Sequence, residues 1–363
     1  MGYAESDEEE RFELFRKGHY YPVNIGDVYS SKYQLMLALR VQRLPTNKVR
    51  GHQYVTLEVY TRDEDYQKEF EIYKQLSQRR SWHRGYWNVR TALDTFIIPR
   101  SGGDHRCLVQ EPMWESFSEL KYRNPTNRFT EELLKAGLIQ VLVALEYLHT
   151  ECKLVHTDIK GHSILQEIAD KAILESFSKA ELEYPSSRKF IDGVPSFGRV
   201  VLYDFGSAVR DDEQQNHNAQ PNFYRSPEVL LKADWSYPID IWSVGVMIWD
   251  LFEDRHLFYG NDPDGRGYTT RAHLAEMIGI LGPPPMDLIS RVTRRYEFFT
   301  EDGKWKQDIE IPRDTSLESS EKFLEGRNKE MFMDFMRGML QWRPEDRKTA
   351  KELLQDPWLN DKF

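Results

Sequence analysis

The sequence predicts an α+β fold of two lobes, a small β-rich lobe followed by a larger, mainly helical one. The first observation is a set of strand-like runs before residue 112. Gln53–Tyr60 (QYVTLEVY) is the clearest, because β-branched and aromatic residues alternate in it. The second is a series of helix-forming segments that begins near residue 130. We therefore divide the chain into a flexible acidic tail (1–18), an N-terminal lobe (19–112) and a C-terminal lobe (113–363).

The N-terminal lobe contains one predicted helix among its strands. Phe70, Tyr73 and Leu76 lie at helical spacing, which predicts a helix over Glu64–Leu76. Two more strands are predicted on either side of a turn-forming SGGD run, at Thr95–Pro99 and Arg106–Gln110.

The C-terminal lobe begins its helices at Thr130, a predicted N-cap residue that is followed by two glutamates. The next segment, Leu133–Leu148, is apolar on nearly all sides, so we expect a buried helix. Further helices are predicted at Ile239–Phe252, Arg271–Leu281, Lys329–Gln341 and Thr349–Leu354. Two segments, Gln166–Gly198 and Pro283–Gly326, are interpreted as surface insertions.

Composition narrows the classes of partner. The 363 residues carry a formal net charge of -10, which disfavours a nucleic-acid binder and favours a basic protein partner. Cys107 and Cys152 are the only cysteines, so we expect a reducing compartment, cytoplasmic or nuclear. No signal peptide opens the chain and no apolar run approaches the length of a membrane span. We expect a monomer without a membrane partner.

Three short runs follow one another along the C-terminal lobe: Val155–Leu165 (VHTDIKGHSIL), Tyr203–Ala208 (YDFGSA) and Tyr224–Glu228 (YRSPE). Their order and spacing resemble the catalytic loop, the metal-binding loop and the end of the activation segment of protein kinases. Each run alone is weak evidence, whereas the three together are specific. The resemblance implies a bilobal protein-kinase-like fold.

Phosphoryl transfer in such enzymes depends on positioning and charge neutralisation. The resemblance implies that Asp158 is the carboxylate that orients the substrate hydroxyl, and that Lys160 is a partner of the transferred phosphate. Asp204 follows the strand-like run Arg199–Tyr203, as the motif requires, and is implied to be a magnesium ligand.

Other residues of these runs have predicted structural roles. We expect Glu228 to pair with a buried arginine, for which Arg347 is the candidate, and Asp240 to hold the backbone of the catalytic loop. Thr157 replaces the arginine that in many kinases binds a phosphorylated activation loop. Between Gly206 and Glu228 there is no threonine, so we expect no activation by loop phosphorylation.

Three features depart from the kinase pattern. Glu58 stands where the phosphate-binding lysine is expected, and we expect it to face Glu71 of the predicted helix as a like-charge pair. No glycine lies between Gly26 and Gly51, so a glycine-rich phosphate loop is missing. Ser163 stands where asparagine is expected to bind a second magnesium ion, and it is a poorer ligand. Lys48 or Arg50 is the predicted substitute cation.

Across residues 20–360 the chain resembles the SR-protein kinases, particularly their fungal relatives. The resemblance rests on HTDIK at His156–Lys160, DFGSA at Asp204–Ala208, and the segments Tyr20–Tyr29, Trp235–Glu253 and Tyr268–Pro285. It implies ATP and Mg²⁺ as cofactors, and Arg/Ser-rich proteins phosphorylated on serine as substrates. It also implies a hinge at Glu111–Met113, in which Glu111 and Met113 contact nucleotide, with Gln110 as gatekeeper.

The sequence leaves three interpretations open. The chain is a kinase that is strongly impaired, or it is a pseudokinase that binds basic protein partners. Under the third interpretation residues 36–52 come from an incorrect gene model, which would explain the missing glycines but neither Glu58 nor Ser163.

Overall fold

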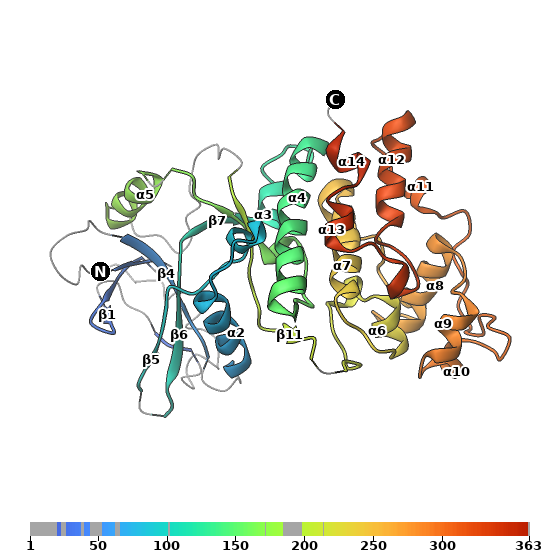
Figure 1. Cartoon of the computed structure of the whole chain (residues 1–363), viewed down its shortest axis with the longest axis horizontal. Helices are drawn as coiled ribbons and strands as arrows, with labels where there is room; N and C mark the ends of the chain where they lie inside the picture. Colours follow the sequence, from blue (N-terminus) through green and yellow to red (C-terminus); the bar gives the residue numbers. More distant parts are fainter. Residues whose placement is uncertain are drawn as a thin grey trace, which may run out of the picture. The chain divides into compact units, whose positions relative to one another are not determined.

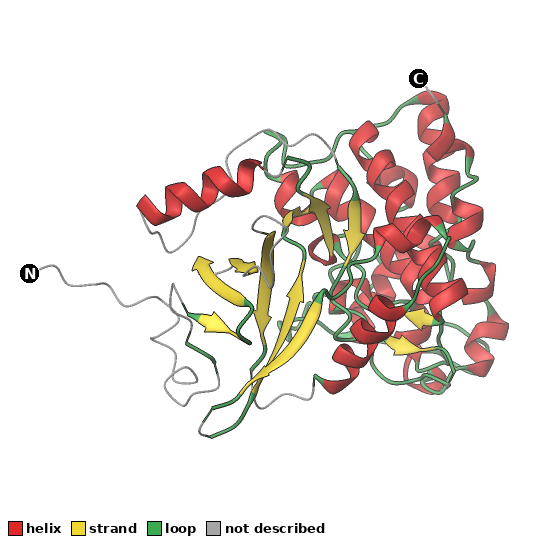
Figure 2. Cartoon of the chain, turned by 60° about the vertical axis from the view of Figure 1, so that its left-hand side comes forward, coloured by secondary structure: helices red, strands yellow, loops and turns green. Residues whose placement is uncertain are grey.

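The computed structural model describes residues 20–22, 27–37, 40–43, 53–61, 66–100, 102–170, 172–183, 198–212 and 214–361. The chain forms two compact units. The first contains Met1–Arg80, Arg90–Trp114 and Gln166–Arg199, and the second contains Ser81–Val89, Glu115–Leu165 and Val200–Phe363. The mixed α+β class predicted from the sequence is confirmed, and Figure 2 shows strands gathered in one main sheet and helices forming most of the remaining structure.

The main sheet belongs to the first unit and has six strands in the order β1-β2-β3-β4-β6-β5, all antiparallel neighbours (Figure 1). The strands are β1 (Val28–Tyr29), β2 (Tyr33–Leu37), β3 (Arg40–Arg43), β4 (Gln53–Val59), β5 (Asp94–Ile98) and β6 (His105–Gln110). The three strands predicted from the sequence correspond to β4, β5 and β6.

Helix α2 (Gln67–Gln78) contacts this sheet. The Arg106 guanidinium of β6 lies 5.6 Å from the centre of the Phe70 ring of the helix. The predicted apolar face is correct, since Phe70, Tyr73 and Leu76 are all buried. On the sheet itself, one core cluster contains Tyr29, Tyr33, Val55, Ile98, Cys107 and Val109.

Helix α5 (Ala172–Glu183) falls in the segment that the sequence assigned to the C-terminal lobe as an insertion. The structure places Gln166–Arg199 in the first unit instead. The physical reason is a second apolar cluster, in which Ile168 and Leu174 are buried against Trp114 and partly buried Tyr54 of β4.

The second unit is mainly helical, as predicted (Figure 1). Its α-helices are α3 (Phe117–Lys121), α4 (Glu131–Tyr147), α6 (Pro227–Leu231), α7 (Pro238–Ile248), α8 (Thr270–Leu281), α9 (Met286–Arg291), α10 (Arg295–Phe298), α11 (Leu317–Ser320), α12 (Gly326–Arg337), α13 (Ala350–Leu353) and α14 (Pro357–Asn360). Short 3-10 and π turns are η2 (Arg84–Asn88), η3 (Leu148–Cys152), η4 (Gly161–Ser163), η5 (Asn222–Tyr224), η6 (Trp249–Glu253) and η7 (Pro344–Asp346).

Two small sheets have the orders β10-β9-β7 and β11-β8, with β7 (Met113–Ser116), β8 (Leu154–Val155), β9 (Ile164–Glu167), β10 (Val200–Leu202) and β11 (Val209–Arg210).

Helix α4 begins as predicted, because the Thr130 side chain accepts a hydrogen bond from the backbone N–H of Leu133. Together with η3 it gives a helix over Glu131–Cys152 that is long and apolar enough to cross a membrane, with a mean hydropathy of 1.3. The sequence analysis missed this length. Since 67% of the apolar window is buried inside the protein, the helix has the pattern of a core helix.

The segment Pro283–Gly326 contains buried apolar residues, and its interpretation as an insertion stays a prediction. Leu288, Phe298 and Phe299 are each at most 4% exposed, and the ring centres of Phe299 and Trp305 lie 5.6 Å apart. Single apolar residues between charged ones therefore anchor α9, α10 and the following loop in the core of the second unit.

Candidate active site

One buried carboxylate, Asp240 of α7, binds the backbone of the catalytic loop in the second unit. Its two oxygens accept hydrogen bonds from the backbone N–H groups of His156 and Thr157, both at 2.8 Å. The ring Nε2 of His149 lies 2.9 Å from the same carboxylate. Asp240 is completely buried. Its predicted role in holding the loop backbone is confirmed.

The catalytic loop is also joined to the segment that contains Asp204. The Thr157 hydroxyl donates to the carbonyl oxygen of Ser207 at 2.8 Å, and the His156 ring Nε2 lies 3.0 Å from the carbonyl oxygen of Tyr203. Phe205 is fully buried, and its ring centre lies 5.1 Å from that of His156. These contacts connect the two predicted motifs directly.

Thr157 and Asp204 adopt left-handed backbone conformations, with φ values of 68° and 69°. Such conformations are costly for residues with a side chain, and for β-branched threonine above all. Strain of this kind persists where surrounding contacts fix the backbone, and it clusters at functional sites.

Asp158 has one carboxylate oxygen with a hydrogen-bond partner and one without. Lys160 Nζ donates to Oδ2 at 2.7 Å. Among the described residues, Oδ1 is buried and has no hydrogen-bond partner. The Asp158 backbone is fixed as well, because its N–H donates to His156 Nδ1 at 3.3 Å and its carbonyl accepts from Ser163 Oγ at 2.7 Å. An unpaired, preorganised acceptor is the kind of group that orients a substrate hydroxyl.

Ser163 closes the catalytic loop. It is completely buried, and its hydroxyl donates a hydrogen bond to the Asp158 carbonyl. The metal-ligand role of Ser163 stays a prediction. No group of three His, Cys, Asp or Glu side chains suited to a metal occurs in the described part of the chain. Magnesium commonly takes only one or two protein carboxylates together with phosphate oxygens, and the half-buried Asp204 fits that use.

Glu58, which the sequence predicts on the nucleotide side, is exposed on β4 opposite Leu108 of β6. The α2 glutamate associated with it is Glu69. Burial raises the pKa of the Tyr60 and Tyr73 phenols, and the carboxylates of Glu58 and Glu69 raise both further. Glu69 is 7% exposed and accepts a hydrogen bond from the Tyr60 hydroxyl at 3.0 Å.

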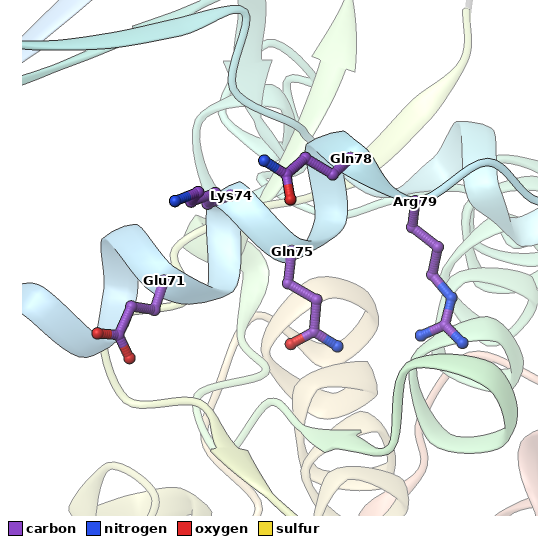
Figure 3. A pocket seen from close by; sticks show the side chains of 5 residues that line it. All are labelled: Glu71, Lys74, Gln75, Gln78 and Arg79. Carbon is purple, nitrogen blue, oxygen red and sulfur yellow. The ribbon is translucent and has the colours of Figure 1, made fainter.

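The predicted like-charge pairing of Glu58 with Glu71 stays a prediction. Glu71 is exposed and accepts a hydrogen bond from Gln67 Nε2, one turn earlier in α2. Figure 3 shows it on the polar face of the helix, where it lines a shallow hollow of about 410 Å³ together with Lys74, Gln75, Gln78 and Arg79. Helical periodicity explains the different burial of the two glutamates. Glu69 lies four and seven residues before Tyr73 and Leu76, on the buried face, whereas Glu71 does not.

A cation that the sequence analysis overlooked lies in the same unit. Arg90 is 9% exposed, and its Nη2 donates to the carbonyl oxygen of Glu111 at 2.9 Å. It also lowers the pKa of Tyr73, against the larger effect of burial. The signal in the sequence was a single arginine in the otherwise uncharged run Tyr86–Leu93, just before β5. The predicted substitute cations Lys48 and Arg50 lie outside the described residues.

The predicted hinge residues have separate surroundings. The Glu111 side chain is 52% exposed and lies 3.7 Å from Arg199 Nη2, while Met113 is buried at the start of β7. Most of the glycine-free stretch Leu39–Val49 lies outside the described residues, apart from β3. The nucleotide-contact roles of Glu111 and Met113 stay predictions.

The end of the activation segment is fixed by neutral and charged contacts. Gln220 donates through Nε2 to the Ile239 carbonyl and the Ser243 hydroxyl, both at 2.9 Å, and accepts from the Ser226 N–H. The Arg347 guanidinium donates to the two oxygens of Glu228 at 2.6 and 2.7 Å, which confirms that predicted pair.

Comparisons with known proteins agree with this arrangement. The family model described as "Protein kinase domain" matches residues 46–359. A serine/threonine protein kinase of Aspergillus fumigatus is 38% identical over 97% of this chain and 90% of its own length. The serine/threonine-protein kinase SRPK of Physarum polycephalum is 26% identical over 98% of this chain and 92% of its own. The serine/threonine-protein kinase AFC2 of Arabidopsis thaliana is 29% identical over 70% of this chain and 59% of its own. The chain belongs to the protein kinase domain family.

Proposed function

We propose that this chain is a serine/threonine protein kinase of the SR-protein-kinase type, with a complete phosphoacceptor side and a weak hold on nucleotide. The observation that carries this proposal is the Asp158 carboxylate. It has one oxygen bound by Lys160 at 2.7 Å, and its other oxygen is buried and without a partner among the described residues.

In the reaction we propose, a serine hydroxyl of the protein substrate donates to Asp158 Oδ1, which orients its oxygen toward the phosphoryl group. The serine oxygen bonds to the γ-phosphorus of ATP while the hydroxyl proton passes to Asp158 Oδ1, the bond from that phosphorus to the β-phosphate oxygen breaks, and ADP leaves. Lys160 lies beside the acceptor as a cation for the transferred phosphate. When bound, Mg²⁺ neutralises phosphate charge, and Asp204 is the residue that would hold it.

Weak nucleotide binding follows from the first unit. A glutamate at position 58 repels phosphate where the family pattern has an attracting lysine, and its neighbour Glu69 adds a second negative charge. Removal of one preorganised charged contact typically lowers a rate about 10²–10³-fold. We therefore propose strongly reduced turnover.

The proposed substrate is a basic, Arg/Ser-rich protein, and the protein is proposed to act as a monomer. Support comes from the formal net charge of -10 and from similarity to a relative named SRPK.

Glu58 also favours a second function, a binding module that retains the fold without phosphoryl transfer. Titration of the purified protein with ATP, with and without Mg²⁺, separates the two. A kinase binds ATP in a magnesium-dependent way and transfers labelled phosphate to an Arg–Ser peptide, and both Asp158→Asn and Asp204→Ala abolish the transfer. Absence of magnesium-dependent ATP binding, together with retained binding of the peptide, would establish the binding module. Transfer that survives Asp204→Ala would contradict the assigned site.

A further inference from the structure

A chain of contacts in the second unit leads from the activation segment to a histidine that the reaction does not use. Tyr224 of η5 donates its hydroxyl hydrogen to Asp250 Oδ2 in η6. The other oxygen of Asp250, Oδ1, lies 2.7 Å from His256 Nδ1. One carboxylate therefore joins a tyrosine of the activation segment to the histidine that follows η6.

Tyr224 lies close to the catalytic carboxylate. Burial raises the pKa of its phenol far above the usual value, and the negative charges of Asp250 and Asp158 raise it further. Tyr224 is 5% exposed, and its hydroxyl is held by Asp250. Asp250 therefore lies one hydrogen bond away from a residue that feels the charge of Asp158.

The surface at His256 is open and aromatic. The imidazole is 35% exposed. It stacks with Phe223, with ring centres 4.6 Å apart, and meets Tyr259 edge-on at 5.4 Å. Tyr259 is itself 41% exposed. Aromatic faces beside a carboxylate attract guanidinium groups.

The charges around Asp250 balance in a way that depends on His256. Lys160 pairs with Asp158 at 2.7 Å, and Lys121 pairs with Asp254 at 2.8 Å. The third carboxylate, Asp250, has only His256 as a possible counter-charge within this group. The six side chains of the three pairs therefore carry a net charge of −1 when His256 is neutral and of zero when it is protonated.

His256 interacts with one carboxylate and one ammonium group. Asp250 of η6 accepts its hydrogen bond and raises the histidine pKa, whereas partial burial and Lys121 of α3 lower it. The net effect is a raised pKa of His256. The remaining neighbours are the rings of Phe223 in η5 and Tyr259.

We propose that His256 is a positioning residue for a cationic peptide substrate. The neutral imidazole leaves Asp250 negative, so that an arginine side chain of the peptide is attracted beside Tyr224. The protonated imidazole cancels that charge and weakens peptide binding. This inference rests on the proposed substrate class, but it concerns binding and does not require phosphoryl transfer.

The test measures the affinity of the full-length protein for a fluorescent Arg–Ser repeat peptide between about pH 5.5 and 8.5. The parent should lose about three- to tenfold in affinity on acidification, since one exposed charge is neutralised. His256→Gln, which keeps a neutral hydrogen-bond donor, should bind as the parent does at high pH and lose this dependence. His256→Lys should bind weakly throughout.

Two controls complete the experiment. His217→Gln replaces another histidine of the second unit, whose ring contacts Trp235, and should keep the parent pH profile. An Ala–Ser peptide should show no pH-dependent binding. An unchanged profile in His256→Gln would overturn the role of His256 alone. Absence of Arg–Ser peptide binding by the parent at every pH would overturn it together with the proposed substrate class.

Discussion

Arg347 and Glu228 form a two-point ion pair in which both side chains are completely inaccessible to solvent. The guanidinium also donates to the Pro238 carbonyl at 3.0 Å and lies 5.0 Å from the centre of a Trp242 ring. The pair thereby fixes the end of the activation segment, through α6, to the start of α7. Its geometry satisfies both charges, which a buried pair requires.

Arg347→Met should destabilise the protein by about 3–5 kcal/mol, because Glu228 would remain buried without its counter-charge. The measurement is the free energy of unfolding in denaturant. Arg343→Met is the matched control, since Arg343 is 34% exposed and pairs with exposed Asp287, and it should cost less than about 1 kcal/mol. Equal losses for the two variants would contradict the structural role of the buried pair.

Asp240→Asn should loosen the catalytic loop without removing a catalytic group. An amide presents two donors to a site where the N–H groups of His156 and Thr157 also donate. The expected cost is about 1–3 kcal/mol. Hydrogen exchange at these two amides should accelerate relative to the parent. Asp234→Asn, a change at an exposed position, is the control and should leave both exchange rates as they are.

Most of this framework could be predicted from the sequence because it depends on short motifs. Asp240, Glu228 and Arg347 each occur in a run whose residue types have one consistent use, and the structure confirms all three. The pattern of apolar residues also predicted the buried face of α2.

Other features could not be predicted, because three-dimensional surroundings decide them. Glu69 and Glu71 differ by two positions, and only Glu69 shares the buried face with Tyr73. The hydrogen bond from the Ser163 hydroxyl to the Asp158 carbonyl is required by no motif in the sequence. Nor did motif reasoning identify the link from Tyr224 through Asp250 to His256.

His273 should make stability fall in acid. It is fully buried, and burial lowers its pKa to about 3 from the usual 6.5. Between these values the unfolded chain binds a proton that the folded protein excludes, so the free energy of unfolding decreases as pH falls. The contribution of one group is at most about 1.4 kcal/mol per pH unit.

The measurement compares unfolding free energies of the parent and His273→Gln from neutral pH down to about pH 4, within the window in which only the unfolded chain is protonated at this position. The variant should show a shallower pH dependence, whatever its stability at neutral pH. His217→Gln, at an exposed histidine, is the control and should keep the parent slope. Parallel curves for the parent and His273→Gln would contradict the assigned contribution.

Glu58→Lys should strengthen nucleotide binding. The new ammonium would attract phosphate, and the structure provides it with an ion-pair partner in Glu69, since Glu58 and Glu69 act on the same two phenols. We expect a gain of about 1–3 kcal/mol in ATP binding, measured by direct titration. Turnover should recover less, because the glycine-free stretch before β4 is unchanged.

Glu71→Lys makes the same change of charge on the polar face of α2, away from Glu69, and is the matched control. A general electrostatic effect on ATP would appear in both variants, whereas a specific pair with Glu69 would appear only in Glu58→Lys. The double variant Glu58→Lys/Glu69→Gln should lose part of the gain, because the lysine then lacks its counter-charge. Tight magnesium-dependent binding by the parent, lost in Glu58→Lys, would show instead that Glu58 belongs to a rebuilt nucleotide site.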